Sequence, residues 1–172
     1  MRANGRQPSL RHLRVLVAGM GNILRRDDGF GVAVAQRLQA DDLPSNVTVV
    51  EVGTGGISLV QELMAPPGYD VLVLLDAVQR DDPAGRVVVL DADVPDLDDF
   101  PAAVRRDYLA DMHYAVPSRA LVLAKALGVL PEKTLIVGCQ PQDHEEFEIG
   151  LSRPVNEAVE AAVERVKVLL AG

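Results

Sequence analysis

The 172-residue chain contains no Trp, a single Cys and only 3% aromatic residues. One cysteine excludes an internal disulfide and a cysteine-rich zinc site. With so few aromatic side chains, the core must consist of Val, Leu, Ile and Ala, a composition typical of parallel α/β sheets. No apolar run approaches the roughly 20 residues that a membrane-spanning helix needs.

Basic residues are also scarce, because 17 Lys and Arg stand against 25 Asp and Glu and leave a net charge of −8. Such a chain lacks the basic face that binds nucleic acid, and it is poorly suited to anionic lipid surfaces. Residues 1–12 are basic but lack the apolar segment of a secretory signal, so we expect a flexible tail there. We therefore expect a cytoplasmic protein with one domain over residues 13–172 and no nucleic acid or membrane partner.

The sequence does contain a regular alternation of apolar strands and amphipathic helices. Apolar, β-branched runs predict five strands, at residues 13–18, 47–52, 70–75, 86–90 and 134–138. Helical periodicity predicts one helix that begins at residue 28 and three more at residues 57–64, 117–127 and 154–170.

The connections between these elements define the expected fold class. The segment between Asp76 and the strand at 86–90 is too short for a helical crossover, so this strand should run antiparallel. Residues 91–112 predict a long acidic loop with at most one helical turn. The order of elements is typical of a three-layer α/β/α sandwich around a mostly parallel, twisted sheet with one antiparallel strand.

The stretch VLVAGMGNILRRDDGFG, residues 15–31, combines a buried strand, a glycine turn and the start of a helix. Gly19 and Gly21 resemble the beginning of a dinucleotide-binding fingerprint. That motif needs a third glycine for close helix packing, and Leu24 stands in its place. A nucleotide site is therefore not expected, and attention moves to the acidic residues that follow.

Carboxylates at the ends of strands are the main candidates for chemistry. Asp27 and Asp28 lie at the mouth of the first helix, where we assign Asp27 to capping of that helix and Asp28 to the crevice at the sheet edge. Asp76 ends the most apolar strand, where a carboxylate must be hydrogen-bonded, paired or bound to a metal. An Asp that braces a neighbouring loop is the alternative for this position.

Glu51 ends the second strand, directly before a glycine-rich turn. It could support the same site, or it could be an ordinary exposed acid at a strand end. The turn contains Gly53, Thr54 and Gly55, and its small residues would let an extended peptide approach the backbone closely.

One histidine could complete a metal site with these acids. His113 follows the long acidic loop and precedes a helix, whereas His144 lies in a polar loop and is expected to be solvated. Alone, His113 would be an ordinary surface residue, but with Asp28 and Asp76 it would form an O/O/N site for a divalent transition metal. Cys139 shows no sign of activation and is interpreted as a small buried residue.

Several segments occur together in one known enzyme family. In chain order they are GMGNILRRDDGFG, VEVGTGG, VLVLLDAV, a His shortly before a helix, and IVGCQPQDHEEFEIGLS. They resemble the hydrogenase maturation endopeptidases, the proteases specific to the large subunit of nickel–iron hydrogenases. The resemblance covers nearly the whole chain and implies a monomeric α/β/α sandwich around a five-stranded sheet with one antiparallel strand.

The resemblance also implies an activity and its residues. The protein would remove a C-terminal extension from the large-subunit precursor after nickel insertion. By motif position, nickel or a substitute divalent ion would be bound by Asp28, Asp76 and His113. Asp28, Asp76 and Glu51 would be the catalytic candidates, and the turn at 53–55 would contact the substrate.

The mechanism that we expect uses nickel supplied by the substrate, whose binding would report that metal loading is complete. Catalysis could be metal-assisted or of the aspartic type. Two other functions fit the same residues. One is a metallohydrolase that keeps its own ion, and the other is a nickel-sensing or chaperone-like module that binds the precursor without cutting it.

Overall fold

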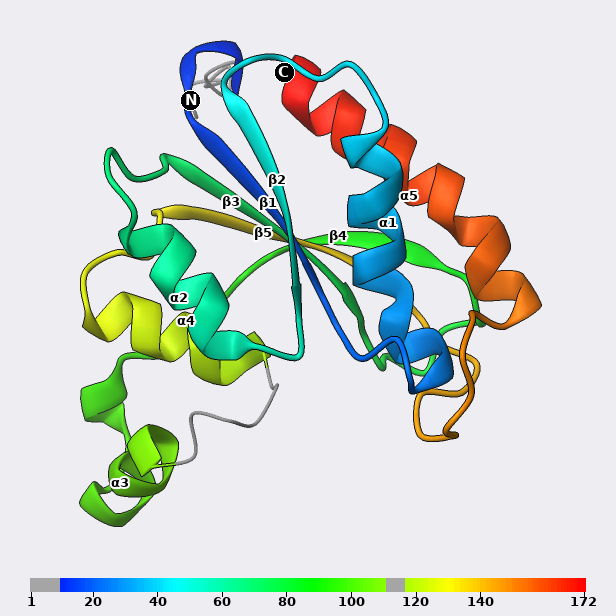
Figure 1. Ribbon diagram of the computed structural model, residues 1–172. Coiled ribbons are helices and arrows are strands. Elements are labelled where there is room, and N and C mark those ends of the chain that lie inside the picture. The colour runs from blue at the N-terminus through cyan, green and yellow to red at the C-terminus, as the bar shows by residue number, and fades with distance from the viewer. Residues whose placement is uncertain (1–9, 111–116) are drawn as a thin grey trace, which may run out of the picture.

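A five-stranded sheet forms the middle layer of the protein (Figure 1). The computed structural model describes residues 10–110 and 117–172. The strands are β1 (Val15–Met20), β2 (Val47–Gly53), β3 (Val71–Ala77), β4 (Val87–Asp91) and β5 (Lys133–Cys139), in the spatial order β2-β1-β3-β5-β4. Only the β4–β5 pair is antiparallel, so the predicted fold class is confirmed, including its one antiparallel strand.

Helices cover both faces of this sheet (Figure 1). One face carries α1 (Phe30–Gln39) and α5 (Arg153–Ala171), and the other carries α2 (Gly56–Met64) and α4 (Pro117–Ala126). A further helix, α3 (Ala102–Ala110), lies away from the sheet beyond α4. Of the helices in the described segments, none has both the length and the apolar character needed to cross a bilayer.

The two-residue period of the strands divides the core into two halves. Val71, Val73 and Leu75 of β3 pack with α1 and α5, whereas Leu72 and Leu74 pack with α2 and α4. All five are completely buried, as expected for a central parallel strand. Because successive side chains point to opposite faces, the next residue, Asp76, belongs to the α2/α4 face.

Glycines allow the first helix to begin directly against the sheet. A Cβ atom at Gly21 would collide with the carbonyl oxygen of Asp28, and φ is +120° at this glycine. A Cβ atom at Gly31 would collide with the carbonyl oxygens of Met20 and Leu75. Gly31 therefore provides the close helix packing that the dinucleotide motif assigns to an earlier position.

The structure corrects two boundaries predicted from the sequence. Residues 10–12, expected in the flexible tail, form the short 3₁₀ helix η1 (Leu10–His12), and Leu10 is buried against the core on the α1/α5 side. The prediction of a loop with at most one helical turn at residues 91–112 is wrong, because η3 (Leu97–Asp99) and the nine-residue α3 lie within it. Residues 101–106 are mostly exposed, and the helical periodicity of the α3 sequence is weak, so the pattern did not reveal this helix.

Candidate functional site

Asp76 occupies the carboxyl edge of the sheet, beside the last residue of β3. Its side chain is half-buried, and among the described residues no side chain donates a hydrogen bond to it or forms an ion pair with it. Burial raises the pKa of Asp76 from 3.8 to about 7, the negative charge of Asp28 adds to the rise, and the backbone N–H of Ala77 opposes it. Burial and a like charge both disfavour the ionised form of this carboxyl group. A bound cation would favour that form and so stabilise the negative charge.

Asp28 lies on the neighbouring 3₁₀ helix η2 (Arg26–Gly29), which packs against β3. Its Oδ2 accepts a hydrogen bond from the backbone N–H of Asn22 at 2.8 Å. Its Oδ1 takes part in no hydrogen bond within residues 10–110 and 117–172. The structure thus brings Asp28 and Asp76 together, with one carboxylate oriented by the backbone and an oxygen left for a ligand.

A pocket of about 360 Å³ opens from Asp76 along β4 and the start of α4. Apolar side chains from three elements form part of its wall, namely Leu90, Leu121 and Ile136. Asp91 and Asp93 add further carboxylates to the lining, and Ser118 adds a hydroxyl group. A pocket with apolar walls and several acids beside a carboxylate pair is suited to a polypeptide segment that carries a cation.

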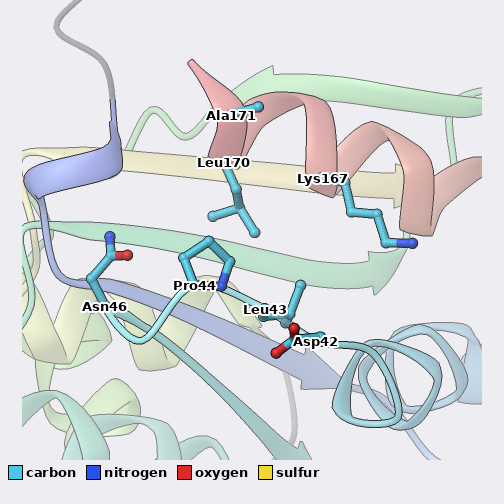
Figure 2. Close-up of a pocket in the computed structure, with 7 residues that line it drawn as sticks. All are labelled: Asp42, Leu43, Pro44, Asn46, Lys167, Leu170 and Ala171. Atoms are coloured by element: carbon cyan, nitrogen blue, oxygen red, sulfur yellow. The ribbon is translucent and has the colours of Figure 1, made fainter.

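A second pocket, of about 440 Å³, lies at the opposite edge of the sheet (Figure 2). Its lining comes from the loop before β2 and the end of α5, with the side chains of Asp42, Leu43, Pro44, Asn46, Lys167, Leu170 and Ala171. A single carboxylate lies in it, that of Asp42. The pocket at Asp76 is therefore the better candidate for catalysis, although it is the smaller of the two.

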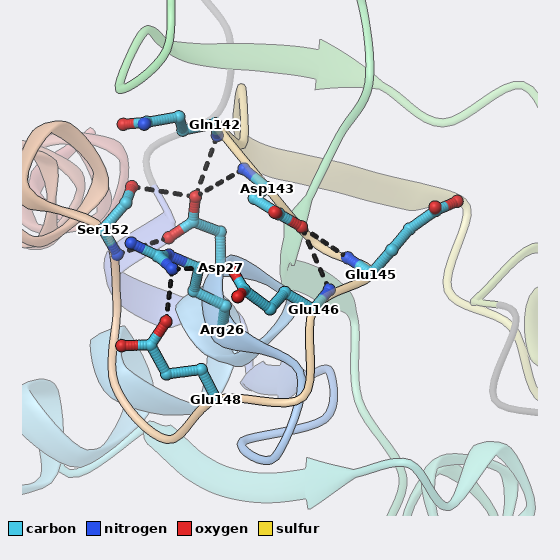
Figure 3. Close-up of polar contacts among 8 residues, drawn as sticks. All are labelled: Arg26, Asp27, Gln142, Asp143, Glu145, Glu146, Glu148 and Ser152. Carbon is cyan, nitrogen blue, oxygen red and sulfur yellow. Dashed lines mark hydrogen bonds and ion pairs between the residues drawn. The ribbon is translucent and has the colours of Figure 1, made fainter.

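Asp27 has a different role from the one predicted. It is completely buried, and its Oδ2 accepts hydrogen bonds from Gln142 N (2.8 Å), Asp143 N (3.0 Å) and Ser152 Oγ (2.8 Å), while Oδ1 accepts one from Ser152 N at 2.6 Å (Figure 3). The predicted cap on α1 is wrong, because Gly29 is the N-cap residue and no side chain caps it. Asp27 instead joins its own loop to the segment between β5 and α5.

Further contacts tie the same two loops together. The backbone N–H groups of Arg26 and Asp27 donate to the carbonyl oxygens of Glu148 (2.8 Å) and Asp143 (3.1 Å). The Arg26 guanidinium pairs with Glu146 at 2.9 Å and also with Glu148 (Figure 3). The loop at 140–152 therefore braces η2 and fixes the position of Asp28. Sequence reasoning missed Asp143 and Ser152, although Ser152 lies in the GLS stretch that contributes to the resemblance.

Glu51 lies apart from the candidate site. Glu51 is exposed and in phase with Val47 and Val49, which pack with the α1/α5 half of the core. Its Oε2 accepts a hydrogen bond from Gln36 Nε2 at 2.9 Å. The structure therefore places Glu51 on the opposite face of the sheet from Asp76 and does not bring the two together.

The glycine turn is joined to the loop that carries Asp28. The N–H of Gly21 donates to the carbonyl oxygen of Gly53 at 3.0 Å, and Gly53 has a φ of +60°. Thr54 is exposed, and Gly55 is the N-cap residue of α2. The turn is thus accessible beside the candidate site, as its proposed contact with a peptide requires.

The remaining candidates have separate outcomes. His113 lies outside the described residues, and Ser118, five positions later in the chain, lines the pocket at Asp76. Within the described segments, no group of three or more His, Cys, Asp or Glu residues is arranged to hold a metal ion. Cys139 is buried, which confirms its interpretation as a small buried residue, and burial together with the charge of Asp27 raises the pKa of its thiol to about 12.

Known proteins are similar to this chain in both sequence and fold. The family model HycI, described as hydrogenase maturation protease, matches residues 32–168. The hydrogenase expression/formation protein HupD of Rhizobium leguminosarum bv. viciae is 36% identical over 159 residues, which are 91% of this chain and 74% of that protein. The hydrogenase 2 maturation protease of Escherichia coli K12 is 30% identical over 161 residues, 92% of this chain and 91% of that protein.

Solved structures agree with these relatives. The hydrogenase maturating endopeptidase HybD of E. coli has a TM-score of 0.71 at 29% identity and covers 91% of both chains. The hydrogenase 2 maturation peptidase from Thaumarchaeota archaeon SCGC_AB-539-E09 has a TM-score of 0.66 at 34% identity, over 91% of this chain and 97% of that one.

Proposed function

Because the chain belongs to the hydrogenase maturation protease family, we propose that it cleaves a C-terminal extension from the large-subunit precursor of a nickel–iron hydrogenase after nickel insertion. The observation that carries this proposal is the pair Asp28 and Asp76. Burial and the charge of Asp28 raise the pKa of Asp76 to about 7, at the edge of the sheet where α/β proteins bind ligands. A cation brought by the substrate stabilises both carboxylates in their ionised forms.

The donor set suits a divalent transition metal. Asp28 offers a free Oδ1, and Asp76 offers a carboxylate without a side-chain donor among the described residues. His113, which lies outside the described residues, is the proposed third ligand by its motif position. The nickel belongs to the precursor, so a precursor without metal lacks the group that these residues recognise.

Residues of this chain also position the reacting groups. The backbone N–H of Asn22 donates to Asp28 Oδ2 and so orients the carboxylate, which can accept a proton from the attacking water through the oxygen that does not bind the ion. A divalent ion at such a site polarises the scissile carbonyl or lowers the pKa of that water. The position of Glu51 on the other face of the sheet gives no support to the catalytic role predicted for it.

The precursor tail would lie between the pocket and the glycine turn. The apolar wall near Leu121 accepts side chains of the extended peptide, and the exposed turn at Gly53, Thr54 and Gly55 admits its backbone. We also propose that the protein is a monomer located in the cytoplasm.

The test is intact-mass spectrometry of nickel-loaded and nickel-free precursor, each incubated with the purified protein. The expected result is a shortened C-terminus in the loaded precursor alone. Equal cleavage of both would overturn recognition through nickel. A stable complex without any mass change would identify a nickel-sensing or chaperone-like module, and a tight stoichiometric metal in the purified protein would identify a resident-metal hydrolase.

A further inference from the structure

Two loops beside the candidate site carry an unusual number of exposed apolar side chains. Eight large hydrophobic residues are exposed among those that the structure describes. Half of them lie on the loop after β1 and the loop before α5, with exposed fractions of 54% for Ile23, 51% for Leu24, 76% for Phe147 and 79% for Ile149. Single exposed hydrophobic residues are ordinary, whereas a group of them at one place marks an interaction surface.

The two loops form one surface because they are joined along their backbones. The backbones of Arg25 and Glu148 form an isolated parallel β-bridge. The Arg25 guanidinium lies over the Phe147 ring, 5.1 Å from its centroid. These contacts place residues 23–25 beside residues 147–149. We call the surface formed by Ile23, Leu24, Phe147 and Ile149 the loop patch.

Hydrogen bonds brace the two loops that carry the loop patch, and the same loops hold Asp28. The buried Asp27 carboxylate binds backbone N–H groups of the 140–152 loop, and Asn22, the residue before Ile23, donates to Asp28. A surface that is fixed before binding loses little conformational entropy when a partner docks. The loop patch therefore lies on the same two loops that hold Asp28 in place.

The charges around the loop patch indicate the kind of partner. The same loop carries Asp143, Glu145, Glu146 and Glu148, and the whole chain has a net charge of −8. Arg26 pairs with Glu146 and Glu148, whereas the Glu145 side chain extends away from Arg26 (Figure 3). Four acids stand against Arg25 and Arg26, so an acidic excess surrounds the apolar side chains, and this is complementary to an apolar segment with basic neighbours.

We propose that the loop patch docks an apolar segment of the precursor that is flanked by lysine or arginine side chains. This inference rests on the proposed function, because it names the precursor as the partner. Docking at this surface contributes to affinity for the precursor and takes no part in bond cleavage.

The test compares steady-state cleavage of the nickel-loaded precursor by the wild type, a Phe147→Ser/Ile149→Ser variant and a Val168→Ser control. Val168 is 66% exposed on α5, so its substitution removes a similar apolar side chain outside the loop patch. The loop-patch variant should raise KM by about tenfold and leave kcat unchanged, since exposed anchors act on binding. Val168→Ser should match the wild type. Glu145→Gln should raise KM by about twofold at low salt and less at high salt.

Three outcomes would overturn the proposal. The first is cleavage by the loop-patch variant with the KM of the wild type. The second is a wild-type dimer in sedimentation equilibrium that the variant abolishes, which would assign the loop patch to a second copy of the chain. The third is a wild type that neither cleaves nor binds the precursor, which would remove the proposed function as well. A wild type that binds without cleaving, with binding lost in the variant, would support the loop patch and overturn only the protease.

Discussion

Two regions at the same sheet edge each contain an aspartate, but they differ in how many hydrogen-bond donors they provide to its carboxylate. At the junction of the loops, Asp27 is completely buried and accepts four hydrogen bonds from Gln142, Asp143 and Ser152. At the pocket, Asp76 is half-buried, receives no side-chain donor from the described residues, and has a pKa raised to about 7. A carboxylate with a full set of donors stabilises the fold, whereas one without them is available to a ligand. Burial alone therefore does not distinguish a functional acid from a structural one.

The largest expected effect is on catalysis at Asp76. Asp76→Asn should lower kcat/KM for the nickel-loaded precursor by on the order of 100-fold or more, because it removes a proposed metal ligand. The variant should remain folded, with a thermal midpoint equal to or above that of the wild type at pH 8, since an unfavourable charge is removed. Asp42→Asn, in the pocket at the opposite edge, is the matched control and should keep full activity. Wild-type activity in Asp76→Asn would remove the site assignment.

The next effect is on folding at Asp27. In Asp27→Asn the new amide group must face a backbone N–H, whichever way it is turned, because both carboxylate oxygens accept backbone donors. The free energy of unfolding should fall by about 2–3 kcal/mol in urea denaturation. Ser152→Ala removes only the hydroxyl donor and should cost about 1 kcal/mol. An Asp27→Asn protein as stable as the wild type would show that the junction does not hold the loops together.

A smaller effect is expected in the pH dependence of stability. The pKa of Asp76 rises from 3.8 to about 7 on folding, so between these values the folded state binds a proton that the unfolded state has lost. Stability from this group is complete below pH 3.8 and is lost as the pH rises through 7, with a slope of up to about 1.4 kcal/mol per pH unit.

Urea denaturation of metal-free protein between pH 5 and 8 measures this effect. Asp76→Asn should gain stability relative to the wild type as the pH rises. In Asp28→Asn the loss of a neighbouring negative charge lowers the pKa of Asp76. The decline in stability with rising pH should therefore end at a lower pH in this variant than in the wild type. A constant difference between Asp76→Asn and the wild type over this range would contradict the raised pKa.

The smallest effect is expected at the surface of the loop junction. Glu146→Gln breaks an ion pair with Arg26 whose glutamate side chain is 55% exposed. The free energy of unfolding should change by less than about 1 kcal/mol, because exposed ion pairs are screened by solvent. Urea denaturation of Glu146→Gln and Asp27→Asn, measured side by side, compares the two contacts. A fall in the free energy of unfolding as large in Glu146→Gln as in Asp27→Asn would contradict the weaker contribution expected of the exposed ion pair.

The fold could be predicted from the sequence because its strands and most helices carry clear periodicity. The continuous apolar run VLVLL before Asp76 and the apolar stripe of α5 result directly from burial, so both were recognised. The α3 sequence has only weak helical periodicity, so this helix was missed. The antiparallel β4 followed from the length of the connection alone.

The candidate site was predictable only in part. Asp28 and Asp76 were predicted as candidates because Asp76 ends a buried strand and Asp28 lies where the first helix begins, at an edge where ligands bind. The hydrogen-bond partners of Asp27 lie 115 to 125 positions away in the sequence, and no local sequence pattern indicates contacts of this kind. The face on which Glu51 lies depends on how β2 aligns with β1, a register that the sequence does not encode locally.

The most direct test of the account is the mass of the hydrogenase large subunit purified from cells that co-express its precursor with this protein. The account predicts a subunit shortened at its C-terminus with the wild type and a full-length precursor with Asp76→Asn. A full-length precursor in both cells, or a shortened subunit in both, would contradict the claim that this chain cleaves the precursor through Asp76.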